Sequence, residues 1–328
     1  MTLISNYPDA VAILRDRKFS SSRHAAVFAR LRARTGAVLA DTENFFKEWL
    51  MYMDGLAHQT VRAVVVSTLK RCEEGSFNSR RDVENAIAVG RVDGAWIENV
   101  VSRWHAEMFG MTPGQQAEMF ELCDPLLRFL LHRETDRLAI LDQRVRDLLS
   151  WMTKQQFEEG KAISNLMRKK VPLGTIVNLV IDSYEPVKVG LANIFYIAGR
   201  VDPTIYPPRT FVMECLRLLP PFRFINRLDT ESCPVGEKVS IDLMQCNRDT
   251  SAFQEPELIA KRGVQSLTFG KGAHSCPGFS LTSLFLCAIW TDFCVSFASK
   301  GLRVSSEGRE DNDKGLCRIL DLSVRFKA

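Results

Sequence analysis

Residues 269–278 constrain the fold of this chain more than any other segment. Their sequence, FGKGAHSCPG, places Cys276 in a glycine-rich turn directly before an apolar run at residues 279–298. Glycine carries no Cβ, so that other backbone and a flat ligand can approach this turn closely. The apolar run predicts a buried helix, and the unpaired N–H groups and the dipole at a helix N-terminus favour a thiolate. The segment therefore predicts a cysteine whose thiolate form is stabilised by the turn around it.

A thiolate in this setting is suited to be the axial ligand of a heme iron, because hydrogen bonds from nearby groups tune its electron donation. The plainer interpretation is a buried structural cysteine in a turn that is rich in glycine. The chain has nine cysteines but no Cys-x-x-Cys pair, which indicates neither a zinc site nor a redox dithiol. A heme also needs cations for its two propionates, and these must come from other parts of the fold.

The composition excludes several other classes of protein. With 46% hydrophobic and 25% charged residues among 328, the chain can bury a sizeable core. Its net charge of +4 comes from dispersed basic residues, which does not indicate a nucleic-acid partner. The run at 281–298 carries Asp292 and is expected to be a buried helix and not a membrane span. Without a basic-then-apolar leader, we expect a soluble cytoplasmic protein with reduced thiols and no membrane partner.

Apolar residues spaced three and four apart predict helices over most of the chain, at residues 11–31, 44–71, 95–108, 114–131 and 137–167. Strand-like segments are few and short, at residues 238–244, 302–304 and 320–326. Turns are expected around this sheet at Pro220-Pro221 and at residues 229–237, which contain Cys233, Pro234 and Gly236. No linker or repeat divides the chain. We therefore expect one domain, residues 1–328, that is mainly α with a minor β region.

The turn around Cys276 resembles the cysteine loop of the cytochrome P450 family, Phe-Gly-x-Gly-x-His-x-Cys-x-Gly, at every fixed position. Further segments occur in the order typical of the family, and the resemblance covers essentially the whole chain. It implies a cytochrome P450-like fold of the short, soluble bacterial type. It also implies heme b (iron protoporphyrin IX) as cofactor, with Cys276 as the metal ligand and with Phe269 and Gly278 in the loop that holds it.

The resemblance also implies the side chains that bind the heme propionates. His58 and Arg62 lie four residues apart on one predicted helix, hence on one face, and resemble the family's His-x-x-x-Arg element. Taken alone, such a pair is usually a solvated helix face. Arg227 follows the Pro-rich turn as the family's propionate-binding arginine does, and His274 lies two residues before Cys276, where the family places another donor.

A Glu-x-x-Arg pattern at Glu214 and Arg217 resembles the family's buried ion pair, which has a structural role behind the heme. On any helix the same pattern usually means a surface pair worth a few tenths of a kcal/mol. The arginine that ordinarily follows Phe-x-x-Pro is missing after Pro256. The third member of the network is therefore expected to be Lys261 or Arg262, or to be lost. The tripeptide at residues 247–249, Asn-Arg-Asp, also matches soluble bacterial members.

Two other departures concern the substrate side. The segment at residues 6–11 resembles one that a helix and two strands ordinarily precede, so that the fold is expected to be shortened at its N-terminus. The stretches on either side of the central helix also look trimmed. An open substrate chamber would suit a bulky or carrier-tethered substrate.

The central helix carries the most consequential departure. Oxygen-activating members have an acid followed by a threonine there, and this chain has Glu185 followed by Pro186. Proline donates no N–H and opens the backbone at that turn. The replacement is similar to the peroxide-using branch of the family, whose arginine is here a glutamate. Glu185 is the candidate acid/base; alternatively it binds a cationic substrate group or balances Lys188. If the register slips by one turn, Asp182 or Tyr184 faces inward instead.

Three functions remain open from the sequence. The first is a heme-thiolate oxidoreductase that oxidises a small organic metabolite in a biosynthetic pathway, fed by ferredoxin and reductase or driven by peroxide. The second is a heme-dependent isomerase, dehydratase or rearranging enzyme, because the threonine is missing. The third is a non-catalytic heme-binding homologue. The substrate itself depends on loops that converge only in three dimensions.

Overall fold

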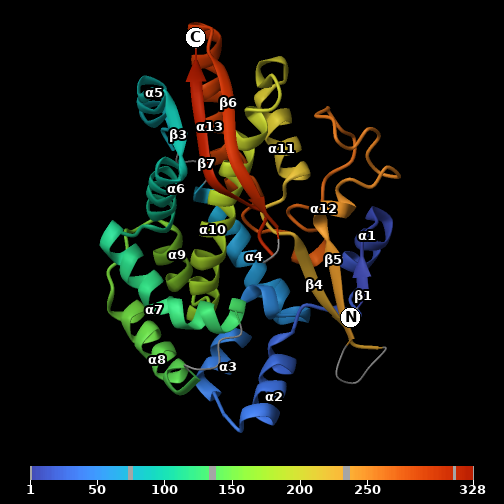
Figure 1. Ribbon diagram of the computed structural model, residues 1–328. Helices are drawn as coiled ribbons and strands as arrows, with labels where there is room; N and C mark the ends of the chain where they lie inside the picture. The colour runs from blue at the N-terminus through green and yellow to red at the C-terminus, as the bar shows by residue number, and fades with distance from the viewer. Residues whose placement is uncertain (1, 73–76, 133–137, 232–236, 313–314, 328) are drawn as a thin grey trace.

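Helices make up most of the protein in the computed structural model, which describes residues 2–72, 77–132, 138–231, 237–312 and 315–327 (Figure 1). Their bounds are α1 Tyr7–Arg15, α2 His24–Thr35, α3 Ala40–Lys47, α4 Gly55–Cys72, α5 Arg80–Val89, α6 Gly94–Phe109, α7 Pro113–His132, α8 Leu138–Lys154, α9 Ala162–Arg168, α10 Leu173–Ala198, α11 Pro208–Leu218, α12 Leu243–Cys246 and α13 Phe279–Lys300. Short 3₁₀ turns lie at η1 Leu50–Tyr52, η2 Pro203–Ile205 and η3 Gly272–His274. The predicted turn residues Cys233, Pro234 and Gly236 lie outside the described residues.

The predictions of single helices over 11–31, 44–71 and 137–167 are wrong, because each segment forms two helices. Between α1 and α2 the chain forms strand β2, Phe19–Ser20, which pairs with a distant strand. Gly55, with φ +65°, begins α4, and Gly160, with φ +83°, separates α8 from α9. Both backbone conformations are in the left-handed region that favours glycine. The apolar spacing in the sequence continues across these breaks, but the helical conformation of the backbone does not.

Two small sheets accompany the helices. One has the order β1-β5-β4-β2, with β1 Thr2–Ile4 parallel to β5 Glu237–Asp242, while β4 Phe224–Asp229 is antiparallel to β5 and to β2. The other has the order β3-β7-β6, with β3 Arg91–Asp93, β7 Arg318–Lys327 and β6 Arg303–Asp311 all antiparallel. Strands β5, β6 and β7 confirm the predicted strands. Residues 243–244 belong to α12 instead, and β1 to β4 were not predicted.

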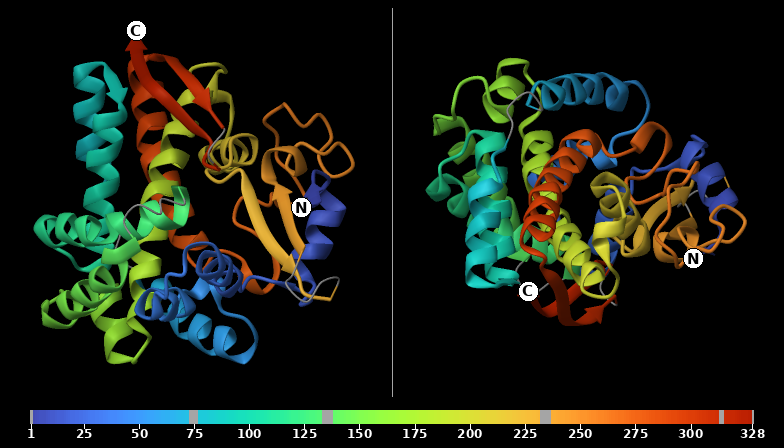
Figure 2. Two further views of the ribbon diagram at one scale, coloured as in Figure 1. Left: turned by 60° about the horizontal axis from the view of Figure 1, so that its bottom comes forward. Right: turned by 90° about the horizontal axis from the view of Figure 1, so that it is seen from above.

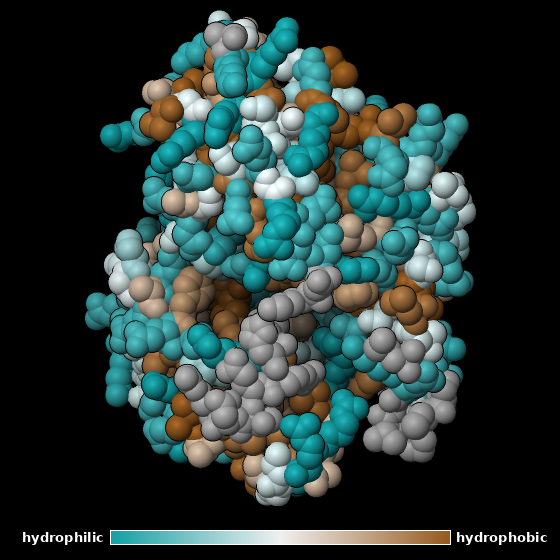
Figure 3. Space-filling model, viewed as in Figure 1, coloured by the Kyte–Doolittle hydropathy of each residue, from teal (hydrophilic) through white to brown (hydrophobic). Residues whose placement is uncertain are grey.

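Helix α10 runs through the middle of the molecule and packs against α6, α11 and strand β7 (Figures 1 and 2). It is apolar nearly all round, which is typical of a core helix. The face shown in Figure 3 is mostly hydrophilic, with apolar groups gathered in a hollow near its middle.

Helix α13 is the one described helix that is long and apolar enough to cross a membrane. Its Trp290, Phe293 and Phe297 are buried against α11 and β7, in aromatic contacts with Phe211 and Phe326. Burial of this aromatic face is the behaviour of a core helix in a folded domain. The buried side of α13 therefore agrees with the prediction of a helix that packs behind the cysteine turn.

Candidate functional site

The cysteine turn joins η3 to α13 in a closed backbone arrangement. The N–H of Cys276 donates to the carbonyl of Phe269 over 2.8 Å, and the N–H of Ser275 donates to the carbonyl of Gly272 over 3.2 Å. Gly278 is the N-cap of α13, so that Cys276 lies two residues before the N-cap of the helix. The ring of Phe269 packs edge-on against Phe279, with centroids 4.9 Å apart. The turn thus fixes the cysteine at a helix N-terminus, as the sequence predicts.

Glycine is required in this turn at Gly272. Its φ is +75°, and a Cβ built there would lie 2.4 Å from the carbonyl oxygen of Leu14 in α1. No side chain can occupy that space without moving the backbone of one partner. The turn is therefore pressed directly onto the first helix of the chain.

Burial opposes ionisation of the Cys276 thiol, but two neighbouring groups favour it. Burial raises its pKa, while the backbone N–H of Gly278 and the charge of Arg62 lower it. These are the groups that a thiolate ligand needs, a hydrogen-bond donor and a nearby cation. Within the described ranges, no three His, Cys, Asp or Glu side chains gather to hold a metal ion by themselves. The donor set therefore fits a metal that brings most of its own ligands, as heme iron does.

Four basic side chains converge beside this turn from three separate parts of the fold. His58 and Arg62 lie on one face of α4, Arg227 lies on β4, and His274 lies in η3. The rings of His58 and His274 stack with centroids 4.0 Å apart, and Arg62 Nη2 donates to the hydroxyl of Ser275 over 3.0 Å. Such a cluster can bind the two carboxylates of a heme.

Three basic side chains of this cluster have lowered pKa values, mainly because they are partly desolvated, and this suits the cluster to bind anions. Burial, followed by the charges of His274 and Arg62, lowers the pKa of His58 to about 4. Burial, followed by the charge of Arg23, lowers the pKa of Arg227 to about 10. Burial disfavours the charge of His58, Arg62 and Arg227, and neighbouring basic groups lower the pKa values of His58 and Arg227 further. A bound dianion would relieve that repulsion.

Asp54 is a member of this cluster that the sequence did not single out. Its Oδ1 accepts a hydrogen bond from His274 Nε2 over 3.1 Å. Burial would raise the pKa of Asp54, but hydrogen bonds from His274 and Ser20 hold it at about 2. His274, expected to bind a propionate, therefore already has a carboxylate partner. Asp54 lies four residues before His58, and this spacing was the signal that could have revealed it.

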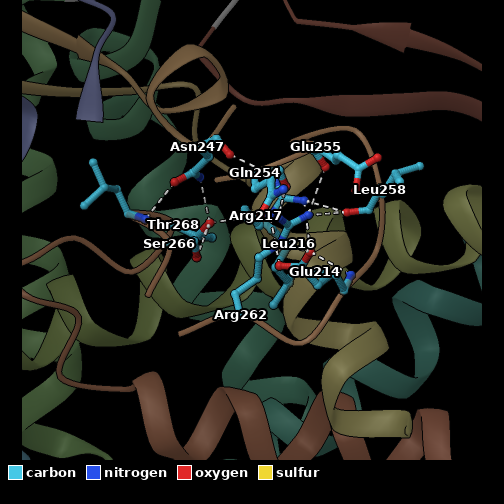
Figure 4. A network of polar contacts seen from close by, with 12 residues as sticks. Glu214, Leu216, Arg217, Asn247, Gln254, Glu255, Leu258, Arg262, Ser266 and Thr268 are labelled. Atoms are coloured by element: carbon cyan, nitrogen blue, oxygen red, sulfur yellow. Dashed lines mark hydrogen bonds and ion pairs between the residues drawn. The ribbon is translucent and has the colours of Figure 1, made fainter. Parts of the chain in front are cut away.

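The Glu-x-x-Arg pair lies behind the cysteine turn in a buried network (Figure 4). Arg217 Nε and Nη2 donate to the two carboxylate oxygens of Glu214 over 2.8 and 2.9 Å, and both side chains are buried. Arg262 Nε donates to Glu214 Oε2 over 3.0 Å. Of the three alternatives for the third member, Arg262 is therefore the one that the structure has. The pair is a buried, bidentate ion pair and not a surface one.

This network is connected to the cysteine turn through Asn247. Arg217 Nη1 donates to the carbonyl of Asn247 over 2.8 Å, and Asn247 Oδ1 accepts from the N–H of Leu267 over 2.7 Å. Asn247 Nδ2 donates to the hydroxyl of Thr268, the residue before Phe269, over 3.2 Å. The position of the turn is thus fixed by the buried ion network.

On the central helix α10, Glu185 lies in ion pairs. Its carboxylate lies 2.9 Å from Lys188 Nζ and 3.2 Å from Arg318 Nη2 of β7, and its side chain is 38% exposed. Lys188 also donates to Glu98 of α6 over 2.5 Å, and Tyr184 donates its hydroxyl to the same carboxylate. Glu185 is therefore held on the side of α10 that contacts α6 and β7.

Asp182 occupies a different position, one helical turn before Pro186. The protein encloses it on every side, yet its side chain keeps some accessible area, so that it borders an internal space. Its charge is close enough to Cys276 to raise the pKa of that thiol. Pro186 has no N–H to donate to the carbonyl of Asp182, although α10 continues through both residues. Of the three candidate groups of α10, Asp182 is thus the one whose charge acts on the cysteine.

The comparisons with known proteins agree with this geometry. No protein-family model matches the chain, and no curated protein matches it. Solved structures do match it over nearly its whole length. P450BioI, in complex with an acyl carrier protein ligated to hexadec-9Z-enoic acid, is 18% identical, with a TM-score of 0.76 over 99% of this chain and 92% of that one.

Two further structures show the same likeness. A thermophilic cytochrome P450 from Sulfolobus tokodaii is 19% identical, with a TM-score of 0.73 over 99% of this chain and 94% of that one. The cytochrome P450 PksS of the Bacillus subtilis 168 bacillaene polyketide synthase is 15% identical, with a TM-score of 0.75 over 99% and 90%. The chain therefore has the cytochrome P450 fold, mainly α with a minor β region, as the sequence resemblance implies.

Proposed function

We propose that this chain, which has the cytochrome P450 fold, is a heme-thiolate oxidoreductase of one domain, residues 1–328, that oxidises a small organic metabolite. The convergence of Cys276 with four basic side chains from separate elements is the observation that carries the proposal. One thiol beside a helix N-terminus and a cluster of cations suit the iron and the propionates of a single flat cofactor.

In this proposal each residue around the cofactor has a defined role. Cys276 would hold the iron of heme b, and the N–H of Gly278 would donate to its sulfur. His58, Arg62, Arg227 and His274 would bind the propionates, and Phe269 would pack in the loop that holds the cofactor. When bound, the heme supplies oxygen or peroxide activation, which an anionic thiolate favours. The residues of the chain bind it, orient it and exclude water.

Glu185 is the candidate acid that exchanges protons between solvent and the substrate side of the heme. Its partial exposure supports exchange with water. Its ion pairs with Lys188 and Arg318 support the other interpretation, in which it balances these two cations. Replacement of Glu185 by glutamine separates the two, as described in the Discussion.

We also propose a substrate carrier and electron donors for the enzyme. P450BioI binds a carrier-tethered fatty acid, and PksS belongs to a polyketide synthase system, which supports a carrier-tethered substrate in a biosynthetic pathway. Ferredoxin and a reductase are the expected electron donors unless peroxide suffices. We place the protein in the cytoplasm, with no membrane or nucleic-acid partner.

The second candidate function is a heme-dependent isomerisation, dehydration or rearrangement. Pro186 favours it, because proline has no hydroxyl that could pass a proton at that turn of α10. Product formation without oxygen and without a reductant would select this function, and an absolute need for oxygen or peroxide would eliminate it.

The experiment that tests the heme-thiolate assignment is the absorption spectrum of the purified, reduced protein with carbon monoxide. A thiolate ligand gives a strongly red-shifted Soret band, which we expect at one heme per chain. A heme-loaded protein without that band would be a heme-binding homologue with another ligand. A protein that binds no heme would overturn the proposal altogether.

A further inference from the structure

The carboxyl of Asp182 is an ionisable group that the proposed cofactor contacts do not use. Protein encloses it on every side, while part of its surface borders the internal space that Cys276 also borders. The amide of Asn178, one turn earlier on α10, donates to its Oδ2. Asn178 is itself 3% exposed, so that the pair is fixed within the core and not on the surface.

No basic side chain within the described ranges forms an ion pair with Asp182. Glu185, three residues later on the same helix, does form such ion pairs, with Lys188 and Arg318. The basic residues near the site lie on the side of α4, β4 and η3, where they surround Asp54. The charged group that does act across the internal space is the Cys276 sulfur, which is also an anion when ionised.

A buried carboxylate without a cation is costly, because desolvation disfavours its charge. Burial raises the pKa of Asp182 to about 7, even though the Asn178 hydrogen bond lowers it. Enzymes retain such groups where a ligand supplies the missing charge, and a cation that contacts this carboxylate would restore a complete ion pair. An apolar residue at position 182 would fill the same space without this cost.

We propose that Asp182, oriented by Asn178, recognises a positively charged group of the substrate, so that the enzyme acts on a protonated or quaternary amine. The inference rests on the proposed heme-thiolate function and names its substrate class. Glu185 does not have this role, because its two cationic partners already satisfy it. The ammonium group binds beside α10, and the remainder of the substrate extends away from it.

Equilibrium binding to the heme-loaded protein tests this proposal. The probe is benzyltrimethylammonium, whose permanent charge cannot ligate iron, and the reference is neopentylbenzene, which has the same shape without the charge. Isothermal calorimetry compares the wild type with Asp182→Asn. The control is Glu84→Gln, which removes one carboxylate from the exposed face of α5, away from the site.

We expect Asp182→Asn to weaken binding of the cation at least about tenfold, as loss of a charge-assisted contact does, and to leave neopentylbenzene unaffected. Glu84→Gln should bind both probes as the wild type does. Equal affinity of wild type and Asp182→Asn for the cation would overturn the proposal. An equal loss for both probes would also overturn it, because Asp182 would then only shape the site.

A second measurement does not depend on a variant. In the wild type, the affinity for the permanent cation should rise between about pH 6 and about pH 8, as Asp182 loses its proton. The carbon monoxide spectrum of each sample separates the two proposals. A thiolate band without any preference for the cation would refute only the role of Asp182, whereas a missing band would refute the heme-thiolate function.

Discussion

The two sides of the proposed heme site differ in how completely their polar groups are partnered. On the side of the cysteine turn, Glu214, Arg217, Arg262 and Asn247 satisfy one another in a buried network. On the side of α10, Asp182 is enclosed by protein without a cation among the described residues, and Pro186 has no N–H to donate to the carbonyl one turn earlier. In the proposed function, the network that fixes the cysteine turn is therefore partnered within the protein, whereas the polar groups on the substrate side are not.

The largest expected effect is on the carbon monoxide spectrum, when the proposed iron ligand is removed on the side of the cysteine turn. Cys276→Ala removes the sulfur while leaving the turn, so that the red-shifted carbon monoxide band should disappear completely. The measurement is the reduced spectrum together with the heme content. Cys287→Ala, at a half-buried cysteine of α13, is the control and should keep the band. An unchanged spectrum in Cys276→Ala would falsify the assignment of the ligand.

The next effect concerns the buried network. Arg217→Ala leaves Glu214 with its charge buried and only Arg262 beside it, which should lower the free energy of unfolding by about 3–5 kcal/mol. Chemical denaturation of the heme-free and heme-loaded protein measures this loss. Arg248→Ala breaks a pair with Glu257, whose side chain is 68% exposed, and should cost less than about 1 kcal/mol. Similar losses for both variants would contradict the structural role of the network.

A smaller effect, on the pH dependence of stability, concerns the contact of α6 with α10. His105 of α6 is buried, donates from Nε2 to the carbonyl of Val180 over 2.8 Å, and accepts at Nδ1 from Gln116. Burial lowers its pKa from 6.5 to about 4, so that the folded protein keeps it neutral while the unfolded chain takes up a proton. The contribution of His105 to stability should therefore be lost as the pH drops from about 6.5 to about 4, by up to about 3 kcal/mol.

The pH dependence of urea denaturation measures this contribution. His105→Gln should show a smaller decrease over the same pH range. The contribution of His58, whose pKa is also lowered to about 4, is lost over the same range, and Asp182, whose pKa is raised to about 7, adds stability there. The contribution of Asp54 is lost only below its ordinary pKa of 3.8. The difference between the wild type and His105→Gln therefore isolates the contribution of His105. An identical decrease in the wild type and in His105→Gln would assign the acid sensitivity to other groups.

The smallest effect on the folded protein belongs to Glu185. Its ion pairs are partly exposed, so that Glu185→Gln should change stability by less than about 1 kcal/mol and leave the heme content unchanged. If Glu185 transfers protons, turnover should nevertheless fall by about 10²- to 10⁴-fold. Turnover equal to that of the wild type would leave Glu185 as the partner of Lys188 and Arg318.

The sequence predicted those parts of the site that are determined locally. The cysteine turn, the pair His58 and Arg62, and the ion pair of Glu214 and Arg217 each lie within one short segment, where spacing alone sets the geometry. Arg262 was one of three alternatives, because the path of residues 254–262 back to Glu214 is tertiary. The short strands β1 to β4 were missed for the same reason.

The direction of Asp182 could not be predicted, because helix phase is decided by packing. Tyr184 and Lys188 contact Glu98 of α6, and these contacts turn the opposite side of α10 toward the cysteine. The sequence left Asp182, Tyr184 and Glu185 as alternatives, and no periodicity distinguishes them in a helix that is apolar nearly all round.

The close approach of Gly272 to Leu14 has a consequence for how the protein folds. Helix α1 and the cysteine turn are far apart in the sequence, so that the contact of Leu14 with Gly272 closes a very long loop. Contacts of such long sequence separation form late in folding, because loop closure must precede them. The cysteine turn can therefore reach its final shape only late in folding, and in the proposed function the capture of the cofactor would be late as well.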